Sequence, residues 1–225
     1  MSRKRKYGLF LYMINNLHPL LQLIAQGEHQ QQDFKFEVND PKKLAITLSA
    51  FANTDGGRLL IGVKDNGTVR GVNPEEEFHV MQSAAGRYCD PPVAVISQIW
   101  KIKDRQVLEV EVKKAEYRPV KALDEKRKGW AYVRVGDRNI LAHPVMLELW
   151  KQERSSREFW MQYKDGSEML LKLLADNTPV SSDEISLRTG LSKRIITLQL
   201  AYLVRWGLAR FVPQHDSFLF QSVKI

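Results

Sequence analysis

The chain has 225 residues, of which 44% are hydrophobic and 27% charged, an ordinary composition for a globular protein with one domain or one domain and a small companion. No apolar run approaches the roughly 18 residues of a membrane-spanning helix. The single cysteine, Cys89, excludes a disulfide framework and a multi-cysteine zinc site. The net charge of +8 favours partners that carry phosphate, because binding them releases counterions.

The chain opens with a basic arm, residues 1–18, whose short apolar run is broken by polar residues and is not followed by a small-residue cleavage site. We interpret it as part of a cytoplasmic protein and not as a signal peptide. A helix is predicted from Pro19, since proline is tolerated in a first helical turn. Alternation over 33–38 predicts a strand with Phe34 and Phe36 on its buried face.

The middle of the chain alternates between helical and extended patterns. Asn39 or Asp40, followed by Pro41, predicts the start of a helix that ends at Gly56 and Gly57, since Asn and Asp are preferred N-caps and proline suits the first turn. The dipeptide Asn-Gly at 66–67 predicts a hairpin turn. The remaining predicted elements are strands over 58–63 and 68–72, a helix over 74–86, strands over 93–102, 106–112 and 130–135, and a helix from 144 to about 158.

A polar segment around 163–167 separates a C-terminal part with a different pattern. Helices are predicted over 168–175, 182–189 and 192–206, and two strands over 208–220. Three helices followed by a hairpin are typical of a winged helix-turn-helix of about sixty residues. The sequence therefore predicts an arm over 1–18, a first domain over 19–162 and a winged-helix domain over 163–225.

Several motifs of the first domain occur in a fixed order. They are Glu28, Asp33, Phe34 and Lys35, then the run Phe51-Ala52-Asn53-Thr54-Asp55-Gly56-Gly57, then 59–63 with Asp65 and Gly67, and finally 131–136 leading into a helix. Over about 130 residues this order resembles the Schlafen/AlbA-like family. The resemblance implies an α+β fold, a mixed sheet with flanking helices, and a nucleic-acid-binding function.

The central run also has a structural interpretation. Gly56 can adopt the left-handed conformation that closes a helix, and Asn53 and Asp55 can bond to nearby backbone groups. The functional alternative is a phosphate-binding concavity lined by Asn53, Thr54 and the glycine amides. The sequence contains no Gly-x4-Gly-Lys-Ser/Thr motif, so we expect no P-loop and no ATP hydrolysis.

The resemblance also implies a possible catalytic site. Some Schlafen-type domains resemble ribonucleases that use three carboxylates, which here correspond to Glu28, Asp33 and Asp65, with Lys35 beside them. Such a set could hold Mg²⁺ or Mn²⁺, which activates water for attack on a phosphodiester. Against this, Asp33 is one methylene shorter than the usual Glu, and Asp65 suits a turn for local reasons. A metal-dependent endoribonuclease is therefore the alternative, and a binding protein without a cofactor is favoured.

A basic region predicts the binding surface. Residues 101–138 carry twelve Lys or Arg against seven Asp or Glu. Tyr117 and Trp130 lie within this region and can stack on bases, although each also suits a core or rim position. The candidate phosphate-binding residues are Lys101, Lys103, Arg105, Lys113, Lys114, Arg134 and Arg138.

The third C-terminal helix is the candidate reader of DNA. Ser192 caps it, and its candidate contacts are Lys193, Arg194, Thr197 and Tyr202. Helical spacing, however, places Ile195 and Leu198 where DNA would lie. The alternative is that this apolar patch packs against the first domain or against a second subunit, forming a homodimer.

These observations lead to one functional prediction. We expect a cytoplasmic protein that binds nucleic acid, DNA rather than RNA, and regulates transcription without a membrane partner. The alternatives are the metal-dependent nuclease and a protein-interaction module.

Overall fold

The computed structural model describes residues 18–154, 167–176 and 178–223. The predicted arm before His18 and the predicted boundary at 163–166 lie outside this part of the chain. Within it, no helix combines the length and the apolar character needed to cross a membrane.

Four helices begin within residues 18–154, and all four start in the same way. Each begins with a proline, and the residue before it accepts a hydrogen bond from a first-turn amide, so the proline costs no hydrogen bond and the side-chain cap satisfies a free N–H. The helices and their N-caps are α2 (Pro19–Ile24) after His18, α3 (Pro41–Asn53) after Asp40, α4 (Pro74–Arg87) after Asn73 and α5 (Pro144–Glu153) after His143.

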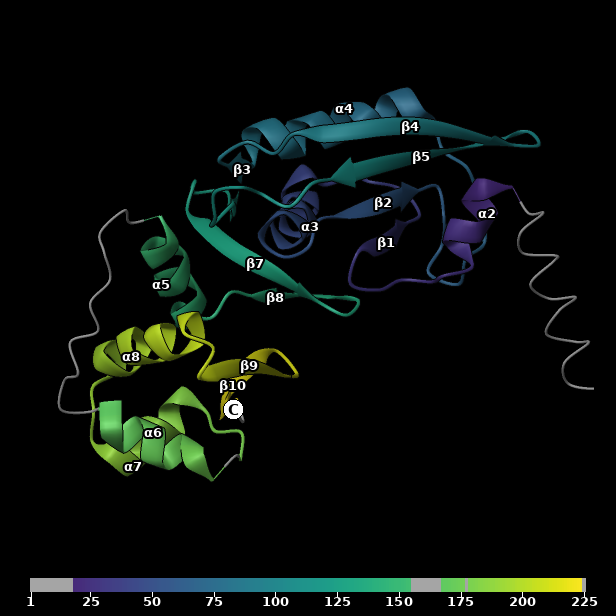
Figure 1. Cartoon of the computed structure of the whole chain (residues 1–225). Coiled ribbons are helices and arrows are strands. Elements are labelled where there is room, and N and C mark those ends of the chain that lie inside the picture. The colour runs from purple at the N-terminus through teal and green to yellow at the C-terminus, as the bar shows by residue number, and fades with distance from the viewer. Residues whose placement is uncertain (1–17, 155–166, 177, 224–225) are drawn as a thin grey trace, which may run out of the picture.

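The first sheet is mixed, as predicted. Its strand order is β1 (Gln32–Lys35), β2 (Gly57–Ile61), β5 (Arg105–Val112) and β4 (Val95–Ile102). Strands β1 and β2 are parallel, and the other two pairs are antiparallel. The main core lies between this sheet and helices α3 and α4, while α2 covers part of the other face through Leu20 (Figure 1).

A second, antiparallel sheet lies against α3. Its order is β3 (Cys89–Asp90), β6 (Lys121–Leu123), β7 (Gly129–Val135) and β8 (Arg138–Leu141). Asn53, at the end of α3, donates to the carbonyls of Val120 and Tyr132 and accepts from the Val120 amide at 2.8 Å. Asn53 therefore holds the end of α3 to β7 and to the residue before β6, which supports the structural interpretation of its motif.

The C-terminal unit, residues 167–176 and 178–223, has the predicted order of elements. It comprises α6 (Ser167–Ala175), α7 (Ser182–Thr189), α8 (Lys193–Arg205), β9 (Ala209–Gln214) and β10 (Ser217–Ser222). Val180 pairs with Phe220 of the hairpin, and both lie in a core that the three helices share.

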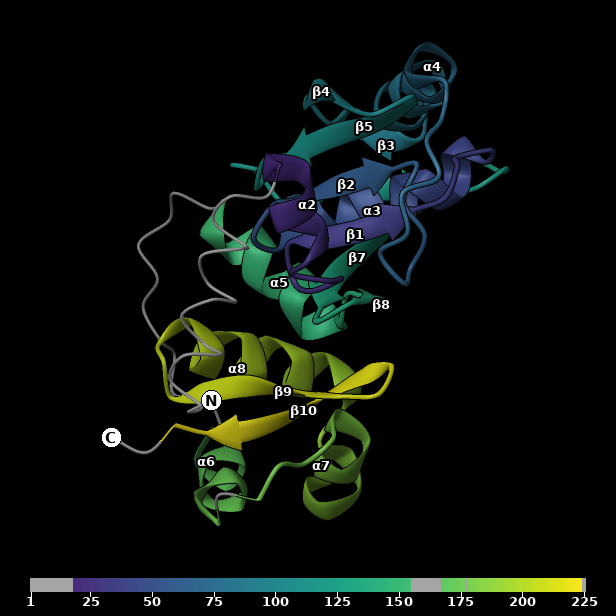
Figure 2. The same ribbon diagram turned by 90° about the vertical axis from the view of Figure 1, so that its right-hand side faces the viewer.

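Helix α5 connects this unit to the first sheets. Val145 lies in the core of the C-terminal unit, and Phe218 of the hairpin lies in a cluster with Trp150 and Val133. The guanidinium of Arg205 in α8 donates to the carbonyl of Gln152 at 3.1 Å. In Figure 2, α8 accordingly lies between α5 and the β9–β10 hairpin.

Two predicted details were wrong. The return strand over 68–72 is not formed; the segment makes one bridge, Val63 with Val69, because Gly62 and Gly71 both have positive φ and turn the chain. Strand β1 stops at Lys35, so Phe36 is 41% exposed instead of buried. Helix α5 ends at Glu153, and residues 155–158 of the predicted helix lie outside the described chain. The short strands β3, β6 and β8 were not predicted.

Candidate functional site

A cluster of charged side chains lies where the chain enters β1. Gly27, with φ +71°, ends the α2 segment and turns the chain, and Glu28 accepts a hydrogen bond from the amide of Phe34 at 2.9 Å. Asp33 is 4% exposed, and its Oδ2 lies 2.6 Å from Nζ of Lys35. Three of the four residues predicted to be catalytic are therefore neighbours.

Arg134 completes this cluster from the second sheet. Its Nη2 lies 3.1 Å from Asp33 Oδ1, its Nη1 donates to Asn139, and its guanidinium lies 5.1 Å from the centre of the Phe51 ring. The residue is 2% exposed. The prediction that Arg134 binds nucleic acid was wrong, because its charge is buried and neutralised by Asp33.

The pKa values of Glu28 and Cys89 bear on the chemistry that this domain could perform. Burial raises the pKa of Glu28, and the hydrogen bond to Asp33 and the charge of Asp33 raise it further. The hydrogen bond from the Phe34 amide and the charge of Lys35 lower it. Burial also raises the pKa of the Cys89 thiol to about 12, so the thiol stays protonated at neutral pH. The buried thiol is therefore not a nucleophile.

The predicted third carboxylate does not join Glu28 and Asp33. Asp33 pairs with Leu59 in the parallel ladder, whereas Asp65 follows the end of β2 in an exposed turn. Among the residues with described side chains, no group of three His, Cys, Asp or Glu could hold a metal ion. The predicted three-carboxylate metal site was therefore wrong in its geometry.

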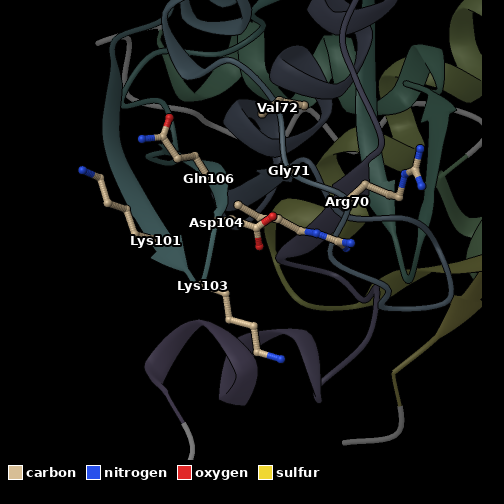
Figure 3. A pocket seen from close by; sticks show the side chains of 8 residues that line it. Arg70, Gly71, Val72, Lys101, Lys103, Asp104 and Gln106 are labelled. Atoms are coloured by element: carbon tan, nitrogen blue, oxygen red, sulfur yellow. The ribbon is translucent and has the colours of Figure 1, made fainter.

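A basic hollow of about 460 Å³ lies beside the β4–β5 turn. Lys101, Lys103, Arg105 and Arg70 line it, with Asp104 as the one acidic residue. None of the four cations makes an ion pair with any described residue. In Figure 3 Lys101 and Arg70 extend to opposite sides of the hollow, and Lys103 projects toward α2.

Backbone geometry explains why these cations come together. Lys103 occupies the tight β4–β5 turn with φ +55°, and Gly71 has φ +79°. A Cβ on Gly71 would lie 3.0 Å from Cβ of Arg105, so the close approach of the two segments requires glycine there. The guanidinium of Arg105 donates to the carbonyl of Val69 and so fastens the two sides of the hollow.

An exposed aromatic ring extends the hollow. Nζ of Lys64 and Cζ of Arg70 lie 5.8 Å and 5.9 Å from the centre of the Phe36 ring. Arg70 also lines the hollow, so it lies beside both the ring and the hollow. We call the six residues together the basic surface: Phe36, Lys64, Arg70, Lys101, Lys103 and Arg105. Sequence reasoning missed Phe36, Lys64 and Arg70, because nothing in the local pattern shows that Phe36 follows the last residue of its strand.

The family model described as Schlafen, AlbA_2 matches residues 28–143, just over half of the chain. The chain belongs to the Schlafen/AlbA_2 family. The match begins at Glu28 and contains the charged cluster and all of the basic surface. It ends at the N-cap of α5, so the C-terminal unit lies beyond it.

Two solved structures resemble the chain weakly. The DIP2311 protein from Corynebacterium diphtheriae is 18% identical over 85% of this chain, with a TM-score of 0.43, and this chain spans only 34% of that protein. The N-terminal domain of a RecG-related protein from Nitrosomonas europaea is 18% identical over 65% of this chain and 95% of its own length, with a TM-score of 0.38. No curated protein matches the chain.

The other predicted cations of the Schlafen/AlbA_2 domain do not lie together. Lys113 and Lys114 follow the far end of β5 from the hollow. Arg138 lies 3.7 Å from Asp216 of the C-terminal hairpin. Lys128 stacks on Trp130, with its Nζ 4.2 Å from the ring centre. The predicted single surface is therefore divided, and Lys101, Lys103 and Arg105 are the part of it that forms a concave site.

In helix α8 of the C-terminal unit, the exposed candidate DNA-contact residues lie at the N-terminal end. Lys193 is exposed and paired with Asp183 at 2.7 Å, and Arg194 is exposed. Thr197 is half-buried. Tyr202 is also half-buried, and burial together with the charge of Glu148 in α5 raises its pKa. Tyr202 therefore lies beside α5. Of the two apolar residues predicted to pack against another surface, Ile195 is 44% exposed and Leu198 is half-buried.

Proposed function

We propose that the protein binds nucleic acid, DNA in preference to RNA, and acts in the cytoplasm as a regulator of transcription. The basic surface carries this proposal. Its cations form no ion pair within the described chain, and they line a hollow whose charge a phosphate backbone would neutralise. Binding through such contacts uses no metal ion or other cofactor and no bond-breaking chemistry.

Phosphate contacts would supply most of the affinity. Four of the five cations of the basic surface line the hollow together with one acidic residue, Asp104. Each phosphate that a protein neutralises changes the slope of log K against log salt by about −0.9 for duplex DNA and about −0.7 for single strands. The proposed interaction therefore weakens steeply as salt is added.

The exposed ring of Phe36 adds a contact of a different kind. Stacking of a base on an aromatic side chain contributes about 1–3 kcal/mol and does not depend strongly on the base. A base in a duplex already stacks on its neighbours, so this contribution is available only to unpaired nucleotides. Phe36 thus provides a means of distinguishing single-stranded from duplex binding.

The test compares matched charge variants of the full chain. The double variant Lys101→Gln, Lys103→Gln should bind a DNA oligonucleotide more weakly than wild type, and its salt slope should be smaller in magnitude by about 2. The control is Lys113→Gln, Lys114→Gln, which removes the same charge at the far end of β5. Fluorescence anisotropy between 50 and 300 mM salt, in EDTA, measures all three proteins with DNA and RNA of the same sequence.

The outcomes separate the parts of the proposal. Wild-type binding that persists in EDTA and is lost mainly in the Lys101, Lys103 variant supports the basic surface as the site. Equal losses in the two double variants would contradict the proposed site. No binding to DNA or RNA at low salt would contradict the function, and tighter binding to RNA would contradict the preference for DNA.

A further inference from the structure

The basic surface contains an exposed aromatic ring that has no role in packing. Strand β1 ends at Lys35, and the side chain of Phe36, the next residue, belongs to none of the core clusters formed by the described residues. Lys64 and Arg70, both exposed, lie within 6 Å of the ring centre, close enough for the face of the ring to attract a cation. The ring is therefore held at the surface among positive charges.

The two cations beside the ring are available to an anionic ligand. Neither Lys64 nor Arg70 forms an ion pair with a described residue. The acidic residues next to them in the sequence do not neutralise them: Glu37 accepts a hydrogen bond from the Asn39 amide group at 2.8 Å, and Asp65 forms no ion pair within the described chain. Phosphates on either side of a stacked base would supply the missing partners.

The hollow that Arg70 also lines has the size of a nucleotide and not of a duplex. Its volume is about 460 Å³, and pockets of about 300–1,000 Å³ hold molecules of drug size. Duplex DNA is a rod wider than its own major groove, which is about 12 Å across. A duplex could only lie across the mouth of the hollow, whereas a nucleotide of a single strand can enter it.

The β4–β5 turn is not built to enter a groove of duplex DNA. A two-stranded ribbon can read the major groove when it projects into it. Here the guanidinium of Arg105 donates to the carbonyl of Val69, and the amide of Val72 donates to the carbonyl of Gln106 at 2.9 Å. Lys103, in the turn, projects toward α2 (Figure 3). The turn is therefore fastened along one side and forms a wall of the hollow.

We propose that the basic surface binds single-stranded DNA, with one unpaired base stacked on Phe36 and the adjoining phosphates held by Lys64, Arg70 and the cations of the hollow. This assignment rests on the proposed function and names the form of DNA that the site takes. Every base has a π face, so the stack adds affinity with little dependence on sequence. In a duplex the neighbouring bases already occupy those faces, and Phe36 cannot contribute.

The first test compares one DNA strand with the same strand annealed to its complement, using the full chain. Fluorescence anisotropy over the same salt range should show that wild type binds the single strand more tightly. Phe36→Leu keeps an apolar side chain without a π face, so it should weaken single-strand binding about 5-fold to 150-fold and leave duplex binding unchanged. The control is Tyr117→Leu, which alters a 65% exposed aromatic residue outside the basic surface and should match wild type.

The second test removes the bases from the ligand. An abasic strand of equal length keeps every phosphate and has nothing to stack, so wild type should bind it more weakly than the normal strand. Phe36→Leu should lose this discrimination, because the ring and the base act through one contact and their losses are not additive. Phe36→Trp restores a π face and should recover the discrimination of wild type.

The outcomes distinguish this inference from the proposed function. A wild type that binds the duplex as tightly as the single strand, or a folded Phe36→Leu that discriminates against the abasic strand as wild type does, would overturn the single-stranded assignment. The proposed function would survive either result, since the Lys101, Lys103 variant tests it separately. If circular dichroism shows that Phe36→Leu does not fold, wild type alone decides, and equal affinity for the normal and abasic strands would overturn the stack.

Discussion

At the scale of single residues, the stability of the first domain depends on ion pairs that are buried rather than exposed. Asp33 receives Arg134 on one oxygen and Lys35 on the other. Removing water from such groups is expensive, and the cost is recovered only while each charge keeps its partner. The cluster joins β1 to β7, strands that are far apart in the sequence, so it holds the two sheets in register with each other.

Arg134→Met should destabilise the protein by about 3–5 kcal/mol, because it leaves the buried carboxylate of Asp33 without one of its two cations. Urea unfolding at pH 7 measures the change. Arg138→Met is the matched control, since Arg138 and Asp216 are exposed and such a pair contributes about 0–1 kcal/mol. Equal losses in the two variants would show that Arg134 does not hold a buried charge.

The sequence could identify the members of this cluster but not their roles. Glu28, Asp33 and Lys35 lie within eight residues, and local motifs select them. Arg134 pairs with Asp33 across 101 positions, and alternation along its strand gives no sign of that partner. Burial of an arginine depends on which distant strand covers it, so its predicted place on the surface was wrong.

At the scale of elements, the capped helices were predicted well and the shortest strands were not. Proline with an N-cap is a local signal, and it marks the starts of α3, α4 and α5. Strands β3 and β6, of two and three residues, are too short to show a period. The predicted strand over 68–72 failed because an Asn-Gly turn signal says nothing about the glycines at 62 and 71, which redirect the chain on either side of it.

Gly71→Ala tests whether the close approach of Gly71 to Arg105 maintains the shape of the hollow. An alanine at φ +79° costs about 1–2 kcal/mol, and its Cβ would push against Arg105. We expect lower stability and weaker DNA binding with no change in net charge. Thermal unfolding and fluorescence anisotropy measure the two effects. Gly136→Ala, also at positive φ but with open space around its Cβ, is the control and should affect stability without weakening binding.

At the scale of the whole molecule, helix α5 is shared by two cores. Its Trp150 packs against the second sheet, and its Val145 lies in the core of the C-terminal unit. Helix α5 packs against α8, so it covers part of the apolar surface of that helix, while Ile195 stays 44% exposed. Helical spacing shows that such a face exists, but not whether DNA, another subunit or the same chain covers it.

His143, the N-cap of α5, should make this junction sensitive to pH. Its Nδ1 accepts from the Val145 amide, its ring packs on Phe220 with centroids 5.2 Å apart, and burial lowers its pKa against the opposing charge of Asp183. A histidine with a lowered pKa stabilises the fold above its ordinary value near 6.5 and loses that contribution as the pH falls.

Thermal unfolding at pH 7.5 and pH 5.0 tests this expectation. The wild-type Tm should fall more over this interval than the Tm of His143→Asn, because asparagine keeps an acceptor at the N-cap and does not titrate. Equal falls in the two proteins would show that protonation of His143 does not weaken the junction.

The position of α5 shows that the end of the family match differs from the end of the packed structure. The family match stops at residue 143, one residue before this helix begins. A chain cut there would uncover Ala131 and Ile140, which Trp150 and Phe218 now shield from water. The family match is therefore shorter than the set of elements that pack together, because residues beyond 143 complete the cluster around Ala131 and Ile140.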